Sequence, residues 1–450
     1  MDAPTDRDLS RTIDEDFPRV RRELERLIRI PSVSFAGFDP ATVQASAEET
    51  RRLLDAAGMR TRVLEVEGAH PAVLGRIDGP DRAPTVLLYA HHDVQPEGPL
   101  DLWASPPYEP VERDGRIYGR GSSDDKAGIV IHAAAVRAWA GSPPVGVTVF
   151  VEGEEESSSE HLPAFLDRYG DELQADAVVL ADSGNWRQGE PALTTSLRGI
   201  VAVVVEVRTL DHAVHSGEYG GAVPDALTAL CKTLAGLHDE RGTVAVPGLV
   251  QGDADALDLT EADIRAWAGV RPGVALLGEG SLTGRMWRKP AISVLGVDAP
   301  RVQEASNQLV PVARAKVSMR IPPGQDPDQA LEALAKHLES TAPWGAEVRV
   351  TPEASGMPHA LDATGPAYDA LRRAFAEAFG RRPVDMGAGG SIPFLAAFAE
   401  RFPKASLLLT GAADPTSNAH SENESVDVED LRRSCLAEAL FFRYLAGSAP

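Results

Sequence analysis

Short apolar runs alternate with helical patterns along the first part of the chain. Apolar residues recur at helical spacing between Phe17 and Ile28, and Glu48–Ala57 predicts a second helix that Gly58 ends. A further helix is expected at Lys126–Ala140. Strands are expected where apolar runs are bounded by turn residues, at Thr85–Ala90, Val145–Val151, Ala177–Ala181 and Ser406–Thr410. Strands and helices that alternate in this way predict an α/β sheet with a largely parallel centre.

From Ile200 onward the pattern changes to a self-contained series of strands and helices. Its strands are expected at Ile200–Val207, Ala291–Val297, Ala313–Ile321 and Ala346–Thr351, with helices at Asp225–Leu237 and Asp326–Thr341. This order resembles an α+β split β-α-β (ferredoxin-like) sandwich, and the acidic segment Val250–Gly280 is expected to be a loop. Helical patterns resume afterwards, at Ala367–Phe379 and Val428–Tyr444. We therefore expect one domain made of residues 1–196 and 356–450, interrupted by a second at 197–355.

Composition narrows the class of protein. The 450 residues suit more than one domain, and no apolar run approaches the roughly 18 residues that span a bilayer. The N-terminus is polar and acidic, so we expect no secretory signal and a cytoplasmic location. Cys231 and Cys435 are the only cysteines, which excludes a disulfide framework and a thiolate-rich zinc site. Any metal must be held by histidines and carboxylates.

The net charge of −23 argues against a nucleic-acid partner, because a phosphate backbone needs a basic face and no Lys/Arg cluster is present. A membrane partner is not expected either. The acidity is explained either by solubility or, in part, by carboxylates that bind metal.

Candidate metal ligands follow several of the predicted strands. His91, Glu152–Glu156, Asp182 and His420 all come shortly after apolar runs. In open α/β sheets, ligands bind outside the carboxyl ends of the strands, so these residues can converge although the sequence separates them. Asp124 is a further candidate and lies in a glycine-rich segment. This segment lacks the spacing of a phosphate-binding loop and is better explained as a tight turn.

Two local patterns suggest a division of roles. In His91-His92-Asp93, the alternation of an extended segment places His91 and Asp93 on one side, where Asp93 can orient a metal-bound imidazole. The run Glu154-Glu155-Glu156 is either a solvated surface or part of a site. Its place after a buried strand favours the site, with one carboxylate for a metal and a neighbour for a proton.

These segments together resemble the two-zinc metallopeptidase family of carnosinases, cytosolic non-specific dipeptidases, glutamate carboxypeptidases, aminoacylases and succinyl-diaminopimelate desuccinylases, and the dipeptidase branch above all. The resemblance spans nearly the whole chain. It is carried by the segments Arg29–Ser34, Ala90–Pro96, Trp103–Pro110, Asp114–Gly121, Glu152–Ser157, Gly389–Pro393 and His420–Glu424.

The resemblance implies a role for each matching residue. Asp124 would bridge two divalent metal ions, expected to be zinc with manganese or cobalt as alternatives. Glu155 would be the general base, Asp93 would orient His91, and His215 would steady the oxyanion in the active site of a partner subunit. His91 and Asp182 would complete the ligands of one ion, and Glu156 and His420 those of the other. The substrate would be bound by Arg320, Gly389, Gly390 and Ser391.

The same resemblance implies hydrolysis of an amide bond in a dipeptide or short peptide by a hydroxide that bridges the two ions. The insert would act as a lid and as the contact surface of a homodimer. An N-acyl-amino-acid amidohydrolase, a non-catalytic metal-binding scaffold and a two-metal esterase remain alternatives. Ser158, Ala127 and Gln308 depart from residues that are common in the family, which leaves the substrate preference open.

Overall fold

The computed structural model describes residues 4–390 and 393–448, which form two compact units. The first unit contains the chain up to Thr195, Leu361–Met386 and the segment from Pro393 onward; the second contains Ser196–Ala360 and a short segment that starts at Gly387. The division at 1–196, 197–355 and 356–450, with a lid in the middle, stays a prediction from the sequence.

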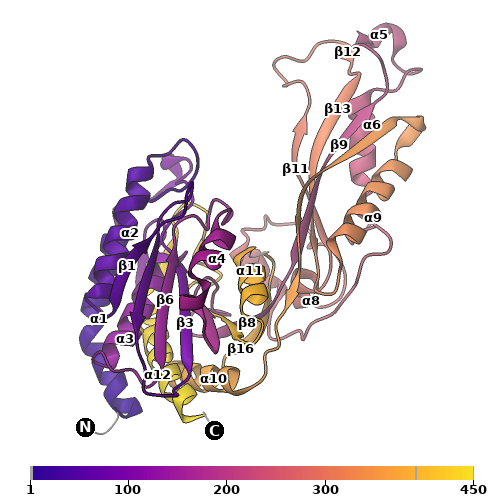
Figure 1. Ribbon diagram of the computed structural model, residues 1–450. Helices are drawn as coiled ribbons and strands as arrows, with labels where there is room; N and C mark the ends of the chain where they lie inside the picture. The colour runs from indigo at the N-terminus through magenta and orange to yellow at the C-terminus, as the bar shows by residue number, and fades with distance from the viewer. Residues whose placement is uncertain (1–3, 391–392, 449–450) are drawn as a thin grey trace. The chain divides into compact units, whose positions relative to one another are not determined.

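The first unit is built on a mixed sheet with a parallel centre (Figure 1). β6, β3, β7 and β17 are all parallel neighbours, whereas β1, β2 and β8 pair antiparallel at the two sides. The fold class predicted from the sequence is therefore confirmed. In spatial order, the strands are β1 (Arg60–Leu64), β2 (Ala72–Ile77), β6 (Gly146–Glu152), β3 (Thr85–His91), β7 (Ala177–Leu180), β17 (Ser406–Leu409), β8 (Ala192–Leu197) and β15 (His359–Ala360), with β16 (Val384–Ala388) also on β8.

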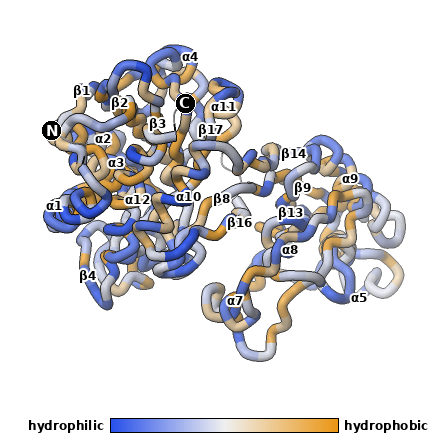
Figure 2. Tube along the Cα trace, turned by 90° about the horizontal axis from the view of Figure 1, so that it is seen from below, coloured by the Kyte–Doolittle hydropathy of each residue, from blue (hydrophilic) through white to orange (hydrophobic). Residues whose placement is uncertain are grey.

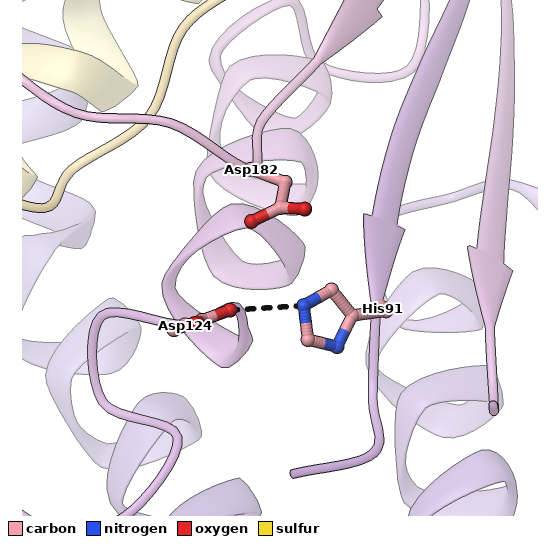
Figure 3. Close-up of side chains that lie close together, drawn as sticks. All are labelled: His91, Asp124 and Asp182. Carbon is pink, nitrogen blue, oxygen red and sulfur yellow. Dashed lines mark hydrogen bonds and ion pairs between the residues drawn. The ribbon is translucent and has the colours of Figure 1, made fainter. Parts of the chain in front are cut away.

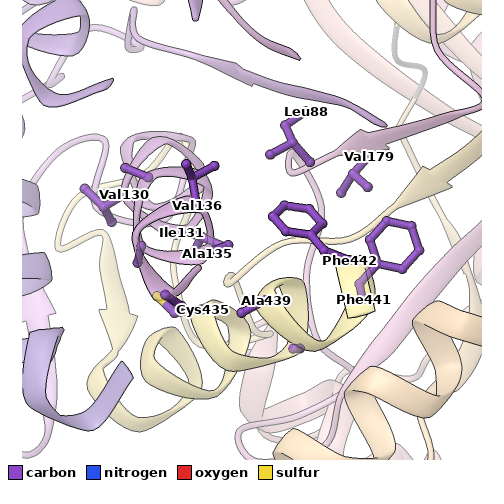
Figure 4. Close-up of a cluster of buried hydrophobic side chains, with 14 of the residues drawn as sticks. Leu88, Val130, Ile131, Ala135, Val136, Val179, Cys435, Ala439, Phe441 and Phe442 are labelled. Atoms are coloured by element: carbon purple, nitrogen blue, oxygen red, sulfur yellow. The ribbon is translucent and has the colours of Figure 1, made fainter. Parts of the chain in front are cut away.

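Helices cover both faces of this sheet. One face carries α1 (Asp6–Ile28), α2 (Pro40–Asp55), α3 (Lys126–Ala138), α10 (Pro366–Phe379) and α12 (Val428–Gly447), and the other carries α4 (Leu162–Leu173) and α11 (Pro393–Arg401) (Figure 1). Successive side chains of β3 point to opposite faces. Leu88 belongs to the core with α3 and α12 (Figure 4), whereas the ring of Tyr89 lies 4.4 Å from that of Phe394 in α11. The strand is thus packed on both sides.

A small antiparallel sheet joins two distant segments of the first unit. β18 (Ser425–Asp427) pairs with β5 (Arg116–Tyr118), which pairs with β4 (Val111–Arg113). Asp427 also caps the N-terminus of α12, because its side chain accepts hydrogen bonds from two backbone N–H groups of the first turn. The segment that follows β5 is therefore held beside the segment that precedes β18.

The second unit is an antiparallel sheet with two helices against one face. Strands β9 (Gly199–Arg208), β11 (Ala291–Asp298), β13 (Val312–Ile321) and β14 (Glu347–Gly356) pair in the order β11-β13-β9-β14. Helix α6 (Ala226–Ala235) packs against β9 and β13, and α9 (Pro327–Ser340) packs against β9 and β14. This is the predicted split β-α-β order. The expectation of a loop at Val250–Gly280 is wrong at α7 (Glu261–Trp267), where Thr260 and Asp263 form a capping box. The remaining short elements are β10 (Val214–His215), α5 (Ser216–Tyr219), α8 (Leu282–Trp287), β12 (Gln308–Leu309) and two 3₁₀ turns, Leu100–Leu102 and Pro343–Gly345.

Hydrophobic segments gather inside the first unit, around α3 and α12, while hydrophilic segments lie on outer elements such as β4 (Figure 2). Within the part of the chain that the structure describes, no helix is both long and apolar enough to cross a membrane.

Replacing Phe442 by alanine should destabilise the first unit strongly. Phe442 is fully buried in the core beneath the sheet (Figure 4), so the substitution removes apolar contacts and leaves a cavity that costs about 3–5 kcal/mol of unfolding free energy. Phe38→Ala is the matched control, because Phe38 is 44% exposed, and it should change the stability by no more than about 0.5 kcal/mol. Urea unfolding followed by circular dichroism measures both. Equal losses in the two variants would contradict the assignment of this core.

Candidate metal centre

His91 ends strand β3 and lies at the carboxyl edge of the parallel strands. Its side chain is fully buried, and its two ring nitrogens face different partners. Nδ1 lies 3.1 Å from the backbone oxygen and 3.4 Å from a carboxylate oxygen of Asp93, while Nε2 lies 3.0 Å from Asp124. Asp93 therefore lies on the same side of the extended segment as His91, as the alternation predicts.

Asp124 lies between two histidines. One of its carboxylate oxygens is 3.0 Å from Nε2 of His91, and the other is 2.9 Å from Nε2 of His420. Figure 3 shows Asp124 on a loop that faces the imidazole of His91, with Asp182 approaching the same point from the segment after β7. The predicted convergence of strand ends therefore holds for residues that lie far apart in the sequence.

The five predicted metal ligands form two groups that share Asp124. His91, Asp124 and Asp182 make one group, and Asp124, Glu156 and His420 make the other. Within each group, one possible ligand atom from every residue lies within 4.8 Å of the others. Such spacing allows each group to hold one ion, with one carboxylate common to both.

The three consecutive glutamates have different environments. Glu154 faces away from the ligand groups and accepts hydrogen bonds from the backbone N–H groups of His70 and His161. The backbone N–H groups of Glu155 and Glu156 both donate to the carboxylate of Asp93, at 3.1 and 3.0 Å. Asp93 therefore positions this acidic turn as well as His91.

The carboxylate of Glu155 lies beside the ligands without belonging to either group. One of its oxygens is 4.0 Å from Nε2 of His91, whereas Glu156 lies 3.2 Å from His420. Burial and the nearby charge of Asp182 raise the pKa of Glu155 well above its usual range. A carboxylate that binds protons more strongly than usual suits transfer of a proton near neutral pH.

Crowding of negative charge sets the protonation of this site. Burial and the charge of Asp124 raise the pKa of Asp182 well above its usual range. Hydrogen bonds to Asp124 and Glu156 raise the pKa of His420 to about 11. Positive charge is therefore strongly favoured between these side chains.

The donor set fits divalent cations. Imidazole nitrogens and carboxylate oxygens are ligands for zinc, and manganese and cobalt accept the same atoms. A bound cation would replace the protons that otherwise offset the crowded carboxylates. The chemistry and the spacing of these side chains thus suit divalent cations.

Two residues that support the ligands were not singled out from the sequence. The hydroxyl of Ser34 donates to Asp93 at 2.7 Å, and the amide of Gln95 donates to Glu156 at 2.8 Å. Gln95 follows Asp93 by two positions, so the alternation that pairs Asp93 with His91 could have indicated it. No local pattern links Ser34 to Asp93.

The remaining predicted site residues lie in the second unit. His215 ends β10 and is exposed, and its Nδ1 accepts a hydrogen bond from the N–H of Gly217. Arg320 is half-buried on β13, and Gly389 lies so close to Arg198 that a Cβ there would be 2.9 Å from its guanidinium. Gly390 follows in the same segment. Ser391 lies outside the described residues, and the roles of all these residues in substrate binding or catalysis stay predictions.

Comparison with known proteins identifies the family. The model of "Peptidase family M20/M25/M40" matches residues 87–442. The chain belongs to this family. A cysteinylglycine-S-conjugate dipeptidase of Corynebacterium striatum is 34% identical over 94% of each chain, and a Beta-Ala-His dipeptidase of Rattus norvegicus is 28% identical over 96% of this chain and 89% of its own. These relatives confirm the predicted family and its dipeptidase branch.

Solved structures of this family share the fold. The dipeptidase Dug1p of Saccharomyces cerevisiae superimposes with a TM-score of 0.82 at 24% identity and covers 99% of both chains. Human carnosine dipeptidase 1 gives the same TM-score and identity, over 99% of this chain and 100% of its own. The family match and the dipeptidase relatives, rather than these structures, confirm the prediction of an enzyme, a peptidase of a metal-dependent family.

Metal binding should release protons and strengthen as the pH rises. At neutral pH the imidazole of His420 carries a proton, because its pKa of about 11 lies well above that pH, and a metal ion requires the neutral ring. Calorimetric titration of metal-free protein with Mn²⁺, in two buffers of different ionisation enthalpy, measures the number of protons released. An affinity that is independent of pH between about 6 and 8, with no proton release, would contradict this account.

Proposed function

We propose that the protein is a dipeptidase that uses two divalent metal ions to hydrolyse the peptide bond of dipeptides. The observation that carries this proposal is the position of Asp124, which belongs to both candidate ligand groups and lies within 3.0 Å of a histidine from each. The names of the relatives from Corynebacterium striatum and Rattus norvegicus support a dipeptide substrate. Zinc is the expected metal, with manganese or cobalt as alternatives.

In this proposal, the ions and Glu155 have separate tasks. Bound divalent ions would polarise a carbonyl group and lower the pKa of water towards roughly 7. Glu155 accepts the proton of the attacking water and delivers it to the leaving amine. Asp93 holds the backbone of Glu155 and the ring of His91, so the base keeps its position relative to the ligands.

Glu155→Gln should abolish most hydrolysis while both metal ions remain bound. The substitution keeps the shape of the side chain but removes the base, whose role is typically worth about 10²–10⁴ in rate. Glu160→Gln, on an exposed neighbour, is the control and should leave kcat unchanged. Metal content of each preparation is measured alongside kcat.

The substrates for this measurement are chosen to separate the alternatives. Cysteinylglycine S-conjugates and β-Ala-His represent dipeptides, and N-acyl amino acids represent the amidohydrolase alternative. Preferential turnover of the N-acyl amino acids would refute the dipeptidase proposal. Near-normal turnover of dipeptides by Glu155→Gln would refute the role of Glu155 as base.

We further propose that the protein is a cytoplasmic homodimer and that His215 acts in the active site of the partner subunit. His215→Ala should then lower kcat much more than the melting temperature, whereas His212→Ala, on an exposed histidine just before β10, should change neither. Mixing Glu155→Gln with His215→Ala after dissociation tests the exchange between subunits. A mixed dimer contains one site with both Glu155 and His215, so activity should reappear.

Light scattering of the mixture establishes whether dimers are present. A monomeric protein with full activity would disprove the action of His215 across subunits. Equal losses of melting temperature and kcat in His215→Ala would identify a structural histidine.

A further inference from the structure

Glu424 is a fully buried carboxylate with no role in the proposed metal binding or catalysis. It lies four residues after the candidate ligand His420 and directly before β18, and its exposed fraction is 0%. Burying a carboxylate is costly unless hydrogen bonds or opposite charges surround it. The partners of Glu424 therefore indicate what its charge stabilises.

Among the residues that the structure describes, the hydrogen-bond partners of its carboxylate all lie on the loop that carries Asp124. One oxygen accepts hydrogen bonds from the backbone N–H of Ser123 at 2.9 Å, from the Ser123 hydroxyl at 3.0 Å and from the backbone N–H of Asp124 at 3.1 Å. The other accepts from the N–H of Gly121 at 2.9 Å and from the guanidinium of Arg120 at 2.8 Å. One side chain thus accepts from three backbone N–H groups of the loop, at Gly121, Ser123 and Asp124, and neutralises a buried arginine.

Further hydrogen bonds hold the segment that carries Glu424. Its carbonyl oxygen accepts a hydrogen bond from the N–H of Gly119 at 2.9 Å, in continuation of the pairing between β5 and β18. The neighbouring Asn423 accepts from the N–H of Ala104 and donates to the carbonyl of Leu102. The segment between His420 and β18 is therefore held on both sides.

We propose that Glu424 is a positioning residue that fixes the loop of Asp124 against the loop of His420 and thereby sets the metal affinity of the centre. This inference rests on the proposed metal centre and adds to it. Asp124 and His420 supply two of the three ligands in the group with Glu156. In the other group only Asp124 lies on these loops, since His91 ends a strand and Asp182 follows one. Loss of Glu424 should therefore weaken the group with Glu156 most.

The test compares Glu424→Gln with Glu438→Gln. Glu438 is also a buried carboxylate in the first unit, but it is paired with His132 in the core, at 2.9 Å, and is not one of the candidate ligands. Zinc binding to the full-length protein is measured in competition with a chromophoric chelator, without substrate, and thermal melting of the metal-free proteins is measured in parallel. Glu424→Gln should lose about 10–100-fold in affinity, and one of the two binding steps should be affected more than the other. Glu438→Gln should melt earlier but keep the wild-type affinity.

Ser123→Ala provides a milder change if Glu424→Gln does not fold. It removes a single hydroxyl donor to Glu424 and leaves the charge and the backbone bonds in place. It should lower the zinc affinity by a smaller factor than Glu424→Gln at nearly unchanged melting temperature.

The inference would be overturned if Glu424→Gln and Ser123→Ala both kept the wild-type zinc affinity and lost melting temperature as Glu438→Gln does. Glu424 would then be a structural residue. Wild-type protein that takes up no metal would overturn it as well. Wild-type protein that binds two ions but hydrolyses no dipeptide would refute the proposed function alone, and the affinities of the variants would still decide the role of Glu424.

Discussion

Repulsion between buried carboxylates is the constraint on which the rest of the structure depends. Asp124, Asp182, Glu155 and Glu156 meet at one edge of the sheet, where burial weakens their hydration and raises the pKa of Asp182 and Glu155. Like charges stay this close only if positive charge offsets them and the backbone prevents them from separating. The histidines, and the cations that the family requires, meet the first condition. The fold meets the second.

The backbone is held by two kinds of support. His91, Asp182 and the acidic turn follow adjacent strands, and β3 packs against α3 on one face and α11 on the other. Asp93 adds hydrogen bonds that link the end of β3 to the turn after β6. Asp124 and His420 lie on loops; the pairing of β5 with β18 holds these loops side by side but does not by itself fix the two side chains. On these loops, buried hydrogen bonds and ion pairs have to hold the ligands in place of packing. Ligands on rigid strands or helices need fewer such contacts.

Residues at strand ends were the part of the site that the sequence could predict. Apolar runs identify β3, β6 and β7, and parallel pairing brings the residues after them together, which is why His91 and Asp182 follow from pattern alone. Strands β1 and β2 at one side of the sheet were not predicted; in β1, Arg60–Leu64 mixes charged and apolar residues without a clear buried run. His420 was also a candidate from its place after an apolar run, but it lies on a loop in a left-handed conformation, and its grouping with Glu156 came from the family resemblance. The support of Asp93 by Ser34 joins residues 59 positions apart and has no local signal.

The two histidines of the centre differ most in their contact with solvent. The side chain of His91 is fully buried beneath the sheet edge, whereas that of His420 is 57% exposed. Water and dissolved ions therefore reach the ligands from the side of His420. Exchange with the surrounding solution would begin with the ion held by His420, and the ion held by His91 would be the slower of the two to leave.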